Sequence, residues 1–159
     1  MIEIERKFLV TSLAFIQEAH QHFRIQQGYL SKDPERTVRV RIKDDKSYIT
    51  IKGASSASGM SRYEWEKEIP LEEGEALLKL ALPVVILKTR YLVKHQNFLF
   101  EVDVFEGKHQ GLILAEVELD DEKTELPLPH WLGKEVTGDP NYYNASLSST
   151  RAKNSRKLN

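Results

Sequence analysis

Charged and apolar residues alternate with period two along most of this chain, and this pattern constrains the fold more than any other feature. Side chains at positions i, i+2 and i+4 of a β-strand point to the same face. The pattern predicts helices only at Leu13–Ala19, at Glu72–Ala81 and near residues 142–147. It predicts eight strands, at residues 2–10, 23–30, 37–43, 47–52, 62–69, 84–94, 98–105 and 112–119. An α+β domain with an antiparallel barrel or wrapped sheet is therefore expected.

The charged faces of these strands are sorted by sign. Like charges two positions apart in a strand lie roughly 7 Å apart, and at an effective dielectric near 20 they repel by about 2 kcal/mol. An open surface tolerates this repulsion, but in a cavity bound counter-charges must offset it. The basic residues of these faces are Lys7, Arg39, Arg41, Lys52, Lys88 and Arg90, and the acidic ones are Glu3, Glu5, Glu64, Glu66, Glu101, Asp103, Glu116 and Glu118.

Period two alone leaves the direction of the charged faces open. An antiparallel sheet commonly has one dry and one wet face, and apolar residues such as Val38, Val40 and Ile42 would suit the core of a barrel with its charges outside. The sorting by sign favours the opposite arrangement, with the charges inside. Basic groups bind phosphate oxygens and carboxylates bind hard cations, so such an interior suits a polyanion that carries divalent metal.

Composition excludes several classes of protein. The 159 residues predict one domain, and 23 Lys+Arg against 24 Asp+Glu give no basic excess for nucleic-acid binding. Cysteine is absent, which excludes disulfides and cysteine–zinc sites. The sequence holds no apolar run of membrane-spanning length, and its charged N-terminus does not resemble a secretory signal. We expect a cytoplasmic protein without nucleic-acid or membrane partners, with a domain at residues 1–150 and a basic tail at 151–159.

Several motifs resemble one known family. The run Glu3-Ile4-Glu5-Arg6-Lys7 resembles the ExExK signature of the CYTH superfamily, the triphosphate tunnel metalloenzymes. The resemblance continues in order to about residue 148, through Arg39-Val40-Arg41, Thr50-Ile51-Lys52, the Glu-rich segment 62–69, Lys88-Thr89-Arg90, segment 101–105 and Glu116-Val117-Glu118. It implies an eight-stranded antiparallel β-barrel, a triphosphate tunnel with its charged faces inward and a few flanking helices.

The resemblance also implies an activity and roles for the sorted residues. The activity is divalent-metal-dependent hydrolysis of the terminal phosphoanhydride of inorganic tripolyphosphate to pyrophosphate and phosphate. Glu3, Glu5, Glu116 and Glu118 would bind Mg²⁺ or Mn²⁺. The substrate would be bound by Lys7, Arg39, Arg41, Lys52, Lys88 and Arg90, while the catalytic candidates Glu64, Glu66, Glu101 and Asp103 would orient the attacking water or support the basic side chains.

Other functions would use the same phosphate cradle. A class IV adenylyl cyclase, or a thiamine or nucleoside triphosphatase, would add a pocket for its organic group. A non-enzymatic polyphosphate sensor would bind without turnover. The sequence leaves these alternatives open, and it is compatible with a homodimer.

Overall fold

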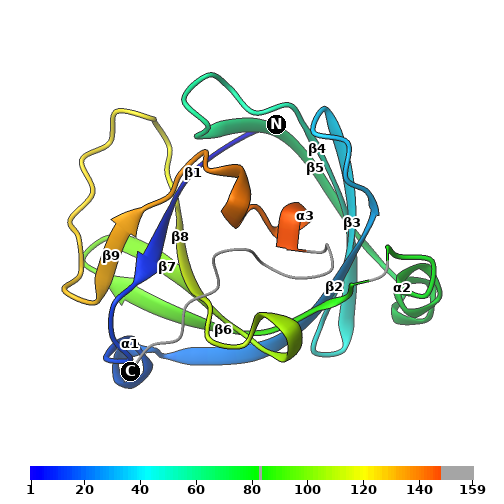
Figure 1. Cartoon of the computed structure of the whole chain (residues 1–159), viewed down its shortest axis with the longest axis horizontal. Coiled ribbons are helices and arrows are strands. Elements are labelled where there is room, and N and C mark those ends of the chain that lie inside the picture. Colours follow the sequence, from blue (N-terminus) through cyan, green and yellow to red (C-terminus); the bar gives the residue numbers. More distant parts are fainter. Residues whose placement is uncertain (83, 148–159) are drawn as a thin grey trace.

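The computed structural model, which describes residues 1–82 and 84–147, shows a closed antiparallel β-barrel of eight strands (Figure 1). Hydrogen-bonded neighbours follow the order β5-β4-β3-β2-β6-β7-β8-β1, and pairing of β1 with β5 closes the ring. This architecture confirms the predicted fold class. The barrel strands are β1 (Ile2–Val10), β2 (Gln21–Ser31), β3 (Arg36–Lys43), β4 (Lys46–Gly53), β5 (Ser61–Ile69), β6 (Ile86–His95), β7 (Phe98–Phe105) and β8 (Ile113–Glu118).

Strand β1 closes the barrel by dividing one of its edges between two partners. Residues 2–4 pair with β5, whereas residues 8–10 pair with a short additional strand, β9 (Leu132–Glu135). The other edge of β1 pairs with β8. The period-two pattern did not predict β9, because four residues are too few to show an alternation.

The apolar faces of β1, β7 and β8 point out of the barrel and pack under a cover. Phe8, Phe100 and Val117 form a buried cluster with Phe15, from α1 (Phe15–Glu18), and with Trp131. The Trp131 side chain is fully buried, with ring centroids 5.6 Å from Phe100 and 5.8 Å from Phe15. The arrangement with all charges outside is therefore wrong for these strands, because their dry face is the outer one.

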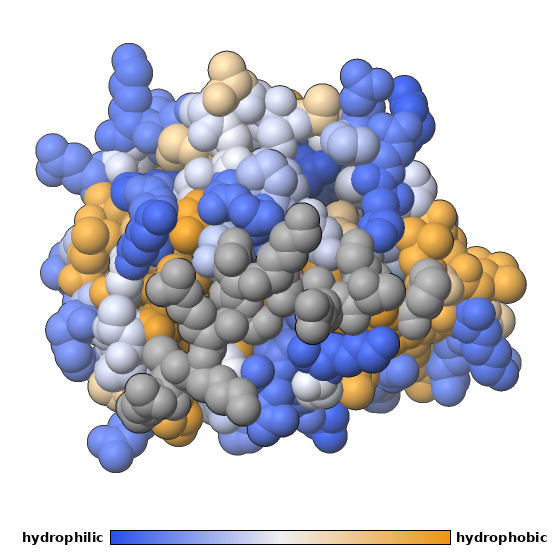
Figure 2. Space-filling view, viewed as in Figure 1, coloured by the Kyte–Doolittle hydropathy of each residue, from blue (hydrophilic) through white to orange (hydrophobic). Residues whose placement is uncertain are grey.

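Helix α2 (Leu71–Leu78) covers part of the opposite outer wall, formed by β2, β3 and β4. Its acidic first turn agrees with the prediction, but the helix ends three residues before Ala81. Figure 2 shows mainly polar side chains on this view of the molecule, with apolar ones gathered at its edges, one of them over α2. Within the described part of the chain, no helix is both long and apolar enough to cross a membrane.

A second apolar cluster fills one end of the barrel interior. Ile86 and Leu114, which precede the inward charges of β6 and β8, pack there with Phe105, Tyr142 and Leu147. Tyr142 belongs to the turn η2 (Pro140–Tyr142) and Leu147 to α3 (Asn144–Leu147), which Figure 1 shows over the barrel interior. The short η1 (Gly107–His109) places buried His109 against the carbonyl oxygen of Leu147. The charged residues therefore occupy the remainder of the interior.

Two strand glycines give a matched test of how closely α2 and the residues after it pack on β2. A Cβ at Gly28 would lie 2.6 Å from the Cβ of Ala81 and 3.0 Å from Cδ1 of Leu78, whereas a Cβ at Gly53 would meet its nearest neighbour, the Cβ of Tyr63, at 3.6 Å. Gly28→Ala should therefore lower the free energy of unfolding by about 1–3 kcal/mol through overpacking, and Gly53→Ala should be tolerated. Urea unfolding measures both variants, and equal stabilities would contradict the close approach.

Candidate active site

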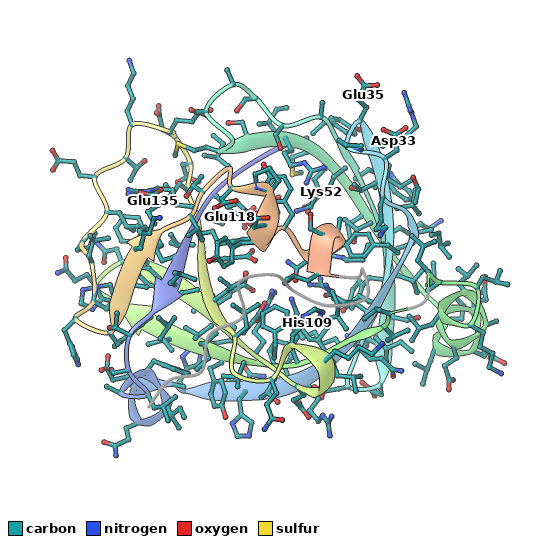
Figure 3. The ribbon with its side chains drawn as sticks, in the orientation of Figure 1. Asp33, Glu35, Lys52, His109, Glu118 and Glu135 are labelled. Atoms are coloured by element: carbon teal, nitrogen blue, oxygen red, sulfur yellow. The ribbon has the colours of Figure 1, made fainter. Side chains whose placement is uncertain are left out.

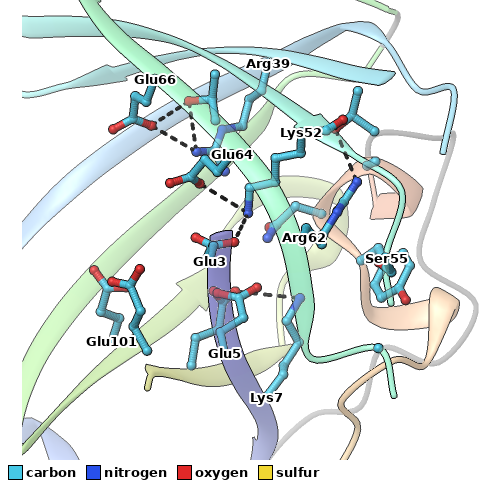
Figure 4. A pocket seen from close by; sticks show the side chains of 18 of the residues that line it. Glu3, Glu5, Lys7, Arg39, Lys52, Ser55, Arg62, Glu64, Glu66 and Glu101 are labelled. Carbon is cyan, nitrogen blue, oxygen red and sulfur yellow. Dashed lines mark hydrogen bonds and ion pairs between the residues drawn. The ribbon is translucent and has the colours of Figure 1, made fainter. Parts of the chain in front are cut away.

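All eight barrel strands contribute side chains to a charged cavity of about 220 Å³ (Figure 4). Figure 3 shows Lys52 and Glu118 within the ring of strands, whereas Asp33 and Glu35 lie outside it. Twelve of the fourteen predicted site residues line the cavity: Glu3, Glu5, Lys7, Arg39, Arg41, Lys52, Glu64, Glu66, Arg90, Glu101, Glu116 and Glu118.

The two other predicted residues, Lys88 and Asp103, are buried outside the cavity lining, with 0% and 1% of their surface exposed. Lys88 Nζ lies 2.7 Å from Asp103 Oδ2, and Arg90 donates to both carboxylate oxygens of Asp103, at 2.7 Å from Nε and 2.9 Å from Nη2. Burial alone would raise the pKa of Asp103, but Arg90 and Lys88 outweigh it and hold this pKa below its usual value. Asp103 is thus placed to fix Arg90.

One wall of the cavity carries the paired arginines of β3. Arg39 and Arg41 each place Nη2 near Glu66 Oε2, at 3.6 Å and 3.5 Å. Thr50 donates to the same oxygen at 2.5 Å and accepts from Arg39 Nη2 at 3.3 Å. Burial opposes ionisation of Glu66, yet the Thr50 hydrogen bond and both arginines lower its pKa. Glu66 is therefore an ionised counter-charge shared by two cations.

The facing wall gathers carboxylates from β1 and β8. Lys52 Nζ lies 2.6 Å from Glu3 Oε1 and 3.5 Å from Glu64 Oε2. Burial, together with the charge of Glu116, raises the pKa of Glu5 to about 8. Glu116 itself ionises readily, because Lys7 and Arg90 outweigh its burial and hold its pKa well below the usual value. At neutral pH this wall therefore retains a proton on Glu5 beside an ionised Glu116.

The carboxylates of this wall fit a hard divalent cation. Oxygen ligands suit Mg²⁺ and Mn²⁺, and a positive charge beside Glu5 and Glu116 would relieve the repulsion that raises the pKa of Glu5. Among residues 1–82 and 84–147, no three acidic or histidine side chains already converge on one metal position. An ion here would use one or two carboxylates with water and phosphate oxygens, which is the usual way that Mg²⁺ binds.

Several cavity residues were not predicted. Arg62 lies on the charged face of β5 that the alternation predicts, with Glu64 and Glu66, but no role was predicted for it. Its Nε donates to the carbonyl oxygen of Gly53 at 2.9 Å. Tyr143 and Asn144 come from the η2–α3 segment, where no strand period signals a shared face. Further lining residues are Tyr29, Thr37, Thr50, Ser55, Gly59, Thr137, Gly138 and Ala145.

The η2–α3 segment contacts the basic groups directly. Lys7 Nζ donates to the carbonyl oxygen of Tyr142 at 3.0 Å, and the Tyr143 ring centroid lies 5.9 Å from the same nitrogen. Lys88 Nζ donates to Asn144 Oδ1 at 3.3 Å. These contacts link the η2–α3 segment to two lysines of the predicted phosphate-binding set.

The raised pKa of Glu5 predicts how stability depends on pH in metal-free protein. Between the ordinary carboxyl pKa of 4.5 and about 8, folded Glu5 holds a proton that the unfolded chain has released. The free energy of unfolding should therefore fall as pH rises through this window, by up to about 1.4 kcal/mol per pH unit. Glu116, whose pKa is lowered, changes the free energy of unfolding only at pH values below this window.

Urea unfolding in a chelating buffer at pH 5.5 and 7.5 measures this slope. Glu5→Gln should make the slope shallower, because the amide does not titrate, whereas Glu3 and Glu118, whose pKa values burial also raises, still do. A wild-type stability that stays constant or rises between these pH values would contradict the environment described for Glu5.

Comparisons with known proteins agree with this architecture. The family model of the CYTH domain matches residues 1–151. A protein of Acetivibrio thermocellus named inorganic triphosphatase is 44% identical over 153 residues, covering 96% of each chain. A Nitrosomonas europaea protein of the same name is 37% identical over 153 residues, covering 93% of this chain and 97% of that one. The crystal structure of an inorganic triphosphatase superposes with a TM-score of 0.64 at 33% identity, covering 92% of this chain and 93% of the other. This chain belongs to the CYTH family.

Proposed function

We propose that this protein is a divalent-metal-dependent inorganic triphosphatase that hydrolyses tripolyphosphate to pyrophosphate and phosphate. The observation that carries the proposal is the cavity itself, in which an arginine wall from β3 faces a carboxylate wall from β1 and β8. The names of the two sequence relatives support the choice of reaction.

The basic residues of the cavity match the charge of the substrate. Tripolyphosphate carries about four to five negative charges near neutral pH. Six cations line the cavity; one is Arg62, and the other five are predicted substrate-binding residues, Lys7, Arg39, Arg41, Lys52 and Arg90. Guanidinium groups bind phosphate oxygens through two parallel hydrogen bonds. We assign these five residues to substrate binding and Lys88, with Asp103, to the support of Arg90.

The carboxylates take two further roles in this proposal. Glu3, Glu5, Glu116 and Glu118 would hold Mg²⁺ or Mn²⁺, and a bound divalent ion would supply charge neutralisation and polarisation at the phosphate oxygens. Glu64, Glu66 and Glu101 lie on the cavity wall and would orient the attacking water. Phosphoryl transfer depends mainly on such positioning and neutralisation. Substrate phosphate would replace Glu66 as the partner of Arg39 and Arg41, leaving that carboxylate able to accept a hydrogen bond from water.

The lining also favours an inorganic substrate over a nucleotide or thiamine triphosphate. A purine or thiazole ring needs an apolar or aromatic pocket, but the lining offers two aromatic side chains, Tyr29 and Tyr143, and the methyl group of Ala145. The remaining lining side chains are mostly charged or hydroxylated. A triphosphate without an organic group fits such a lining best.

Turnover is tested by phosphate release from tripolyphosphate, ATP and thiamine triphosphate, each with Mg²⁺ or Mn²⁺. We expect tripolyphosphate to be the preferred substrate. Arg39→Ala and Glu5→Ala should each lower kcat/KM at least about 100-fold, because the first removes a charge placed against the developing transition state and the second removes a proposed metal ligand. Both variants should stay folded, since Arg39→Ala relieves repulsion with Arg41, and Glu5→Ala removes a carboxyl group whose ionisation is opposed by burial and by Glu116.

Matched controls are Arg36→Ala and Glu35→Ala, whose side chains are exposed outside the barrel. Normal rates in Arg39→Ala and Glu5→Ala would contradict the tunnel assignment. Tight tripolyphosphate binding without phosphate release would favour the sensor, and cyclic AMP formed from ATP would favour the cyclase.

We also propose that the protein forms a homodimer through an uncovered part of its outer wall. Ile2 lies opposite Tyr63 and Ile51 opposite Trp65, on the outer faces of β1, β5 and β4. These side chains are 36–61% exposed, and two such sheet faces can pack against each other. Light scattering of the protein as it elutes from a size-exclusion column should give twice the chain mass, and Trp65→Glu should give a monomer. Leu80→Glu, at an exposed apolar residue after α2, is the control, and a monomeric wild type would refute this interface.

The lack of cysteine is compatible with the predicted cytoplasmic location.

A further inference from the structure

Gln27 is fully buried, and neither polar atom of its amide has a hydrogen-bond partner in the described part of the chain. An unsatisfied buried polar group costs about 1–3 kcal/mol. Native proteins contain few such groups. A leucine or methionine would fill this position without that cost, so the amide calls for an explanation other than packing.

The strand register places Gln27 at the boundary between the apolar and the charged parts of the interior. Gln27 lies on the inward face of β2, between Ile25 and Tyr29, and Tyr29 lines the cavity. Its partner across β6 is Ile86, from the inner apolar cluster, and its partner across β3 is Arg41. Directly opposed residues of antiparallel strands have Cβ atoms about 4.5–5.5 Å apart, so the amide and the Arg41 side chain are neighbours.

The remaining unpartnered atoms belong to the same neighbourhood. Over residues 1–82 and 84–147, four buried side-chain atoms have no partner: Gln27 Nε2, Gln27 Oε1, Arg39 Nε and Arg41 Nε. Oε1 is the only acceptor among these four, and each Nε can only donate. Arg41 has one carboxylate contact, from Nη2 to Glu66 at 3.5 Å, and its Cζ lies 5.7 Å from the Tyr48 ring centroid. Neither contact involves Nε–H.

We infer that Gln27 is a positioning residue for Arg41, whose Nε–H its amide oxygen accepts through one buried water. This bond would hold the base of the guanidinium in place, leaving the Nη edge to face phosphate when Glu66 is displaced. The consequence for substrate binding rests on the proposed function, whereas the hydrogen bond itself does not.

Gln27→Met removes the acceptor while keeping the length of the side chain. Calorimetry should show about tenfold weaker binding of tripolyphosphate, and kinetics a similar rise in KM with kcat changed less than threefold, as expected for one hydrogen bond that orients a charged group. The Arg41 Nε–H signal in nitrogen-15 NMR, assigned by its loss in Arg41→Lys, should exchange with solvent faster than in the wild type.

Two further variants make the result specific. Ile25→Met changes a buried apolar residue on the same face of β2 and should alter neither binding nor the Arg41 signal. Gln27→Glu retains an acceptor and should preserve slow Nε–H exchange, and it carries the test if Gln27→Met does not fold. Unchanged exchange and binding in Gln27→Met, with a higher melting temperature, would overturn the inference. If wild-type protein does not hydrolyse tripolyphosphate, the proposed function fails, but the exchange comparison still decides the role of Gln27.

Discussion

The structure depends on the neutralisation of like charges inside a closed barrel. Basic and acidic side chains share an interior in which most of the basic groups are largely buried, and there their repulsion is stronger than at an open surface. Pairs that cross between strands offset it: Glu66 with Arg39 and Arg41, Glu3 with Lys52, and Asp103 with Lys88 and Arg90. With the interior given mostly to charge, the barrel must bury its apolar faces outside. The covers at Phe15 and Trp131 and the packing of α2 meet that requirement.

Two kinds stand out among these ion pairs. The carboxylate of Asp103 is buried away from the cavity and holds Arg90 through two hydrogen bonds, so it is a permanent part of the scaffold. Glu66 and Glu64 line the cavity and contact their cations at about 3.5 Å, longer than a close ion pair. A phosphate oxygen can replace these looser partners. The interior is thus balanced without ligand, while its binding groups stay available.

The sequence predicted the strands and most of the cavity because alternation and sorted charge are local signals. Residues such as Arg39 and Glu116 were assigned to one interior from the strand pattern and the family resemblance. Alternation could not show that Asp103 is buried against Arg90 and away from the cavity. The residue that Asp103 faces depends on the register between β6 and β7. Tyr143 and Asn144 enter the site from a segment without strand period, and the four-residue β9 is too short to show one. No role for Gln27 could be predicted, since an amide between apolar residues on one face of a strand has meaning only once its neighbour across the sheet is known.

A crystal structure with a hydrolysis-resistant tripolyphosphate analogue and Mn²⁺ tests the central claim most directly, because anomalous scattering locates the metal independently. The account predicts one phosphate chain inside the barrel, with its oxygens on Arg39, Arg41 and Arg90 and manganese beside the carboxylates of β1 and β8. A phosphate chain bound on the outer surface, or manganese located away from Glu5 and Glu116, would contradict it.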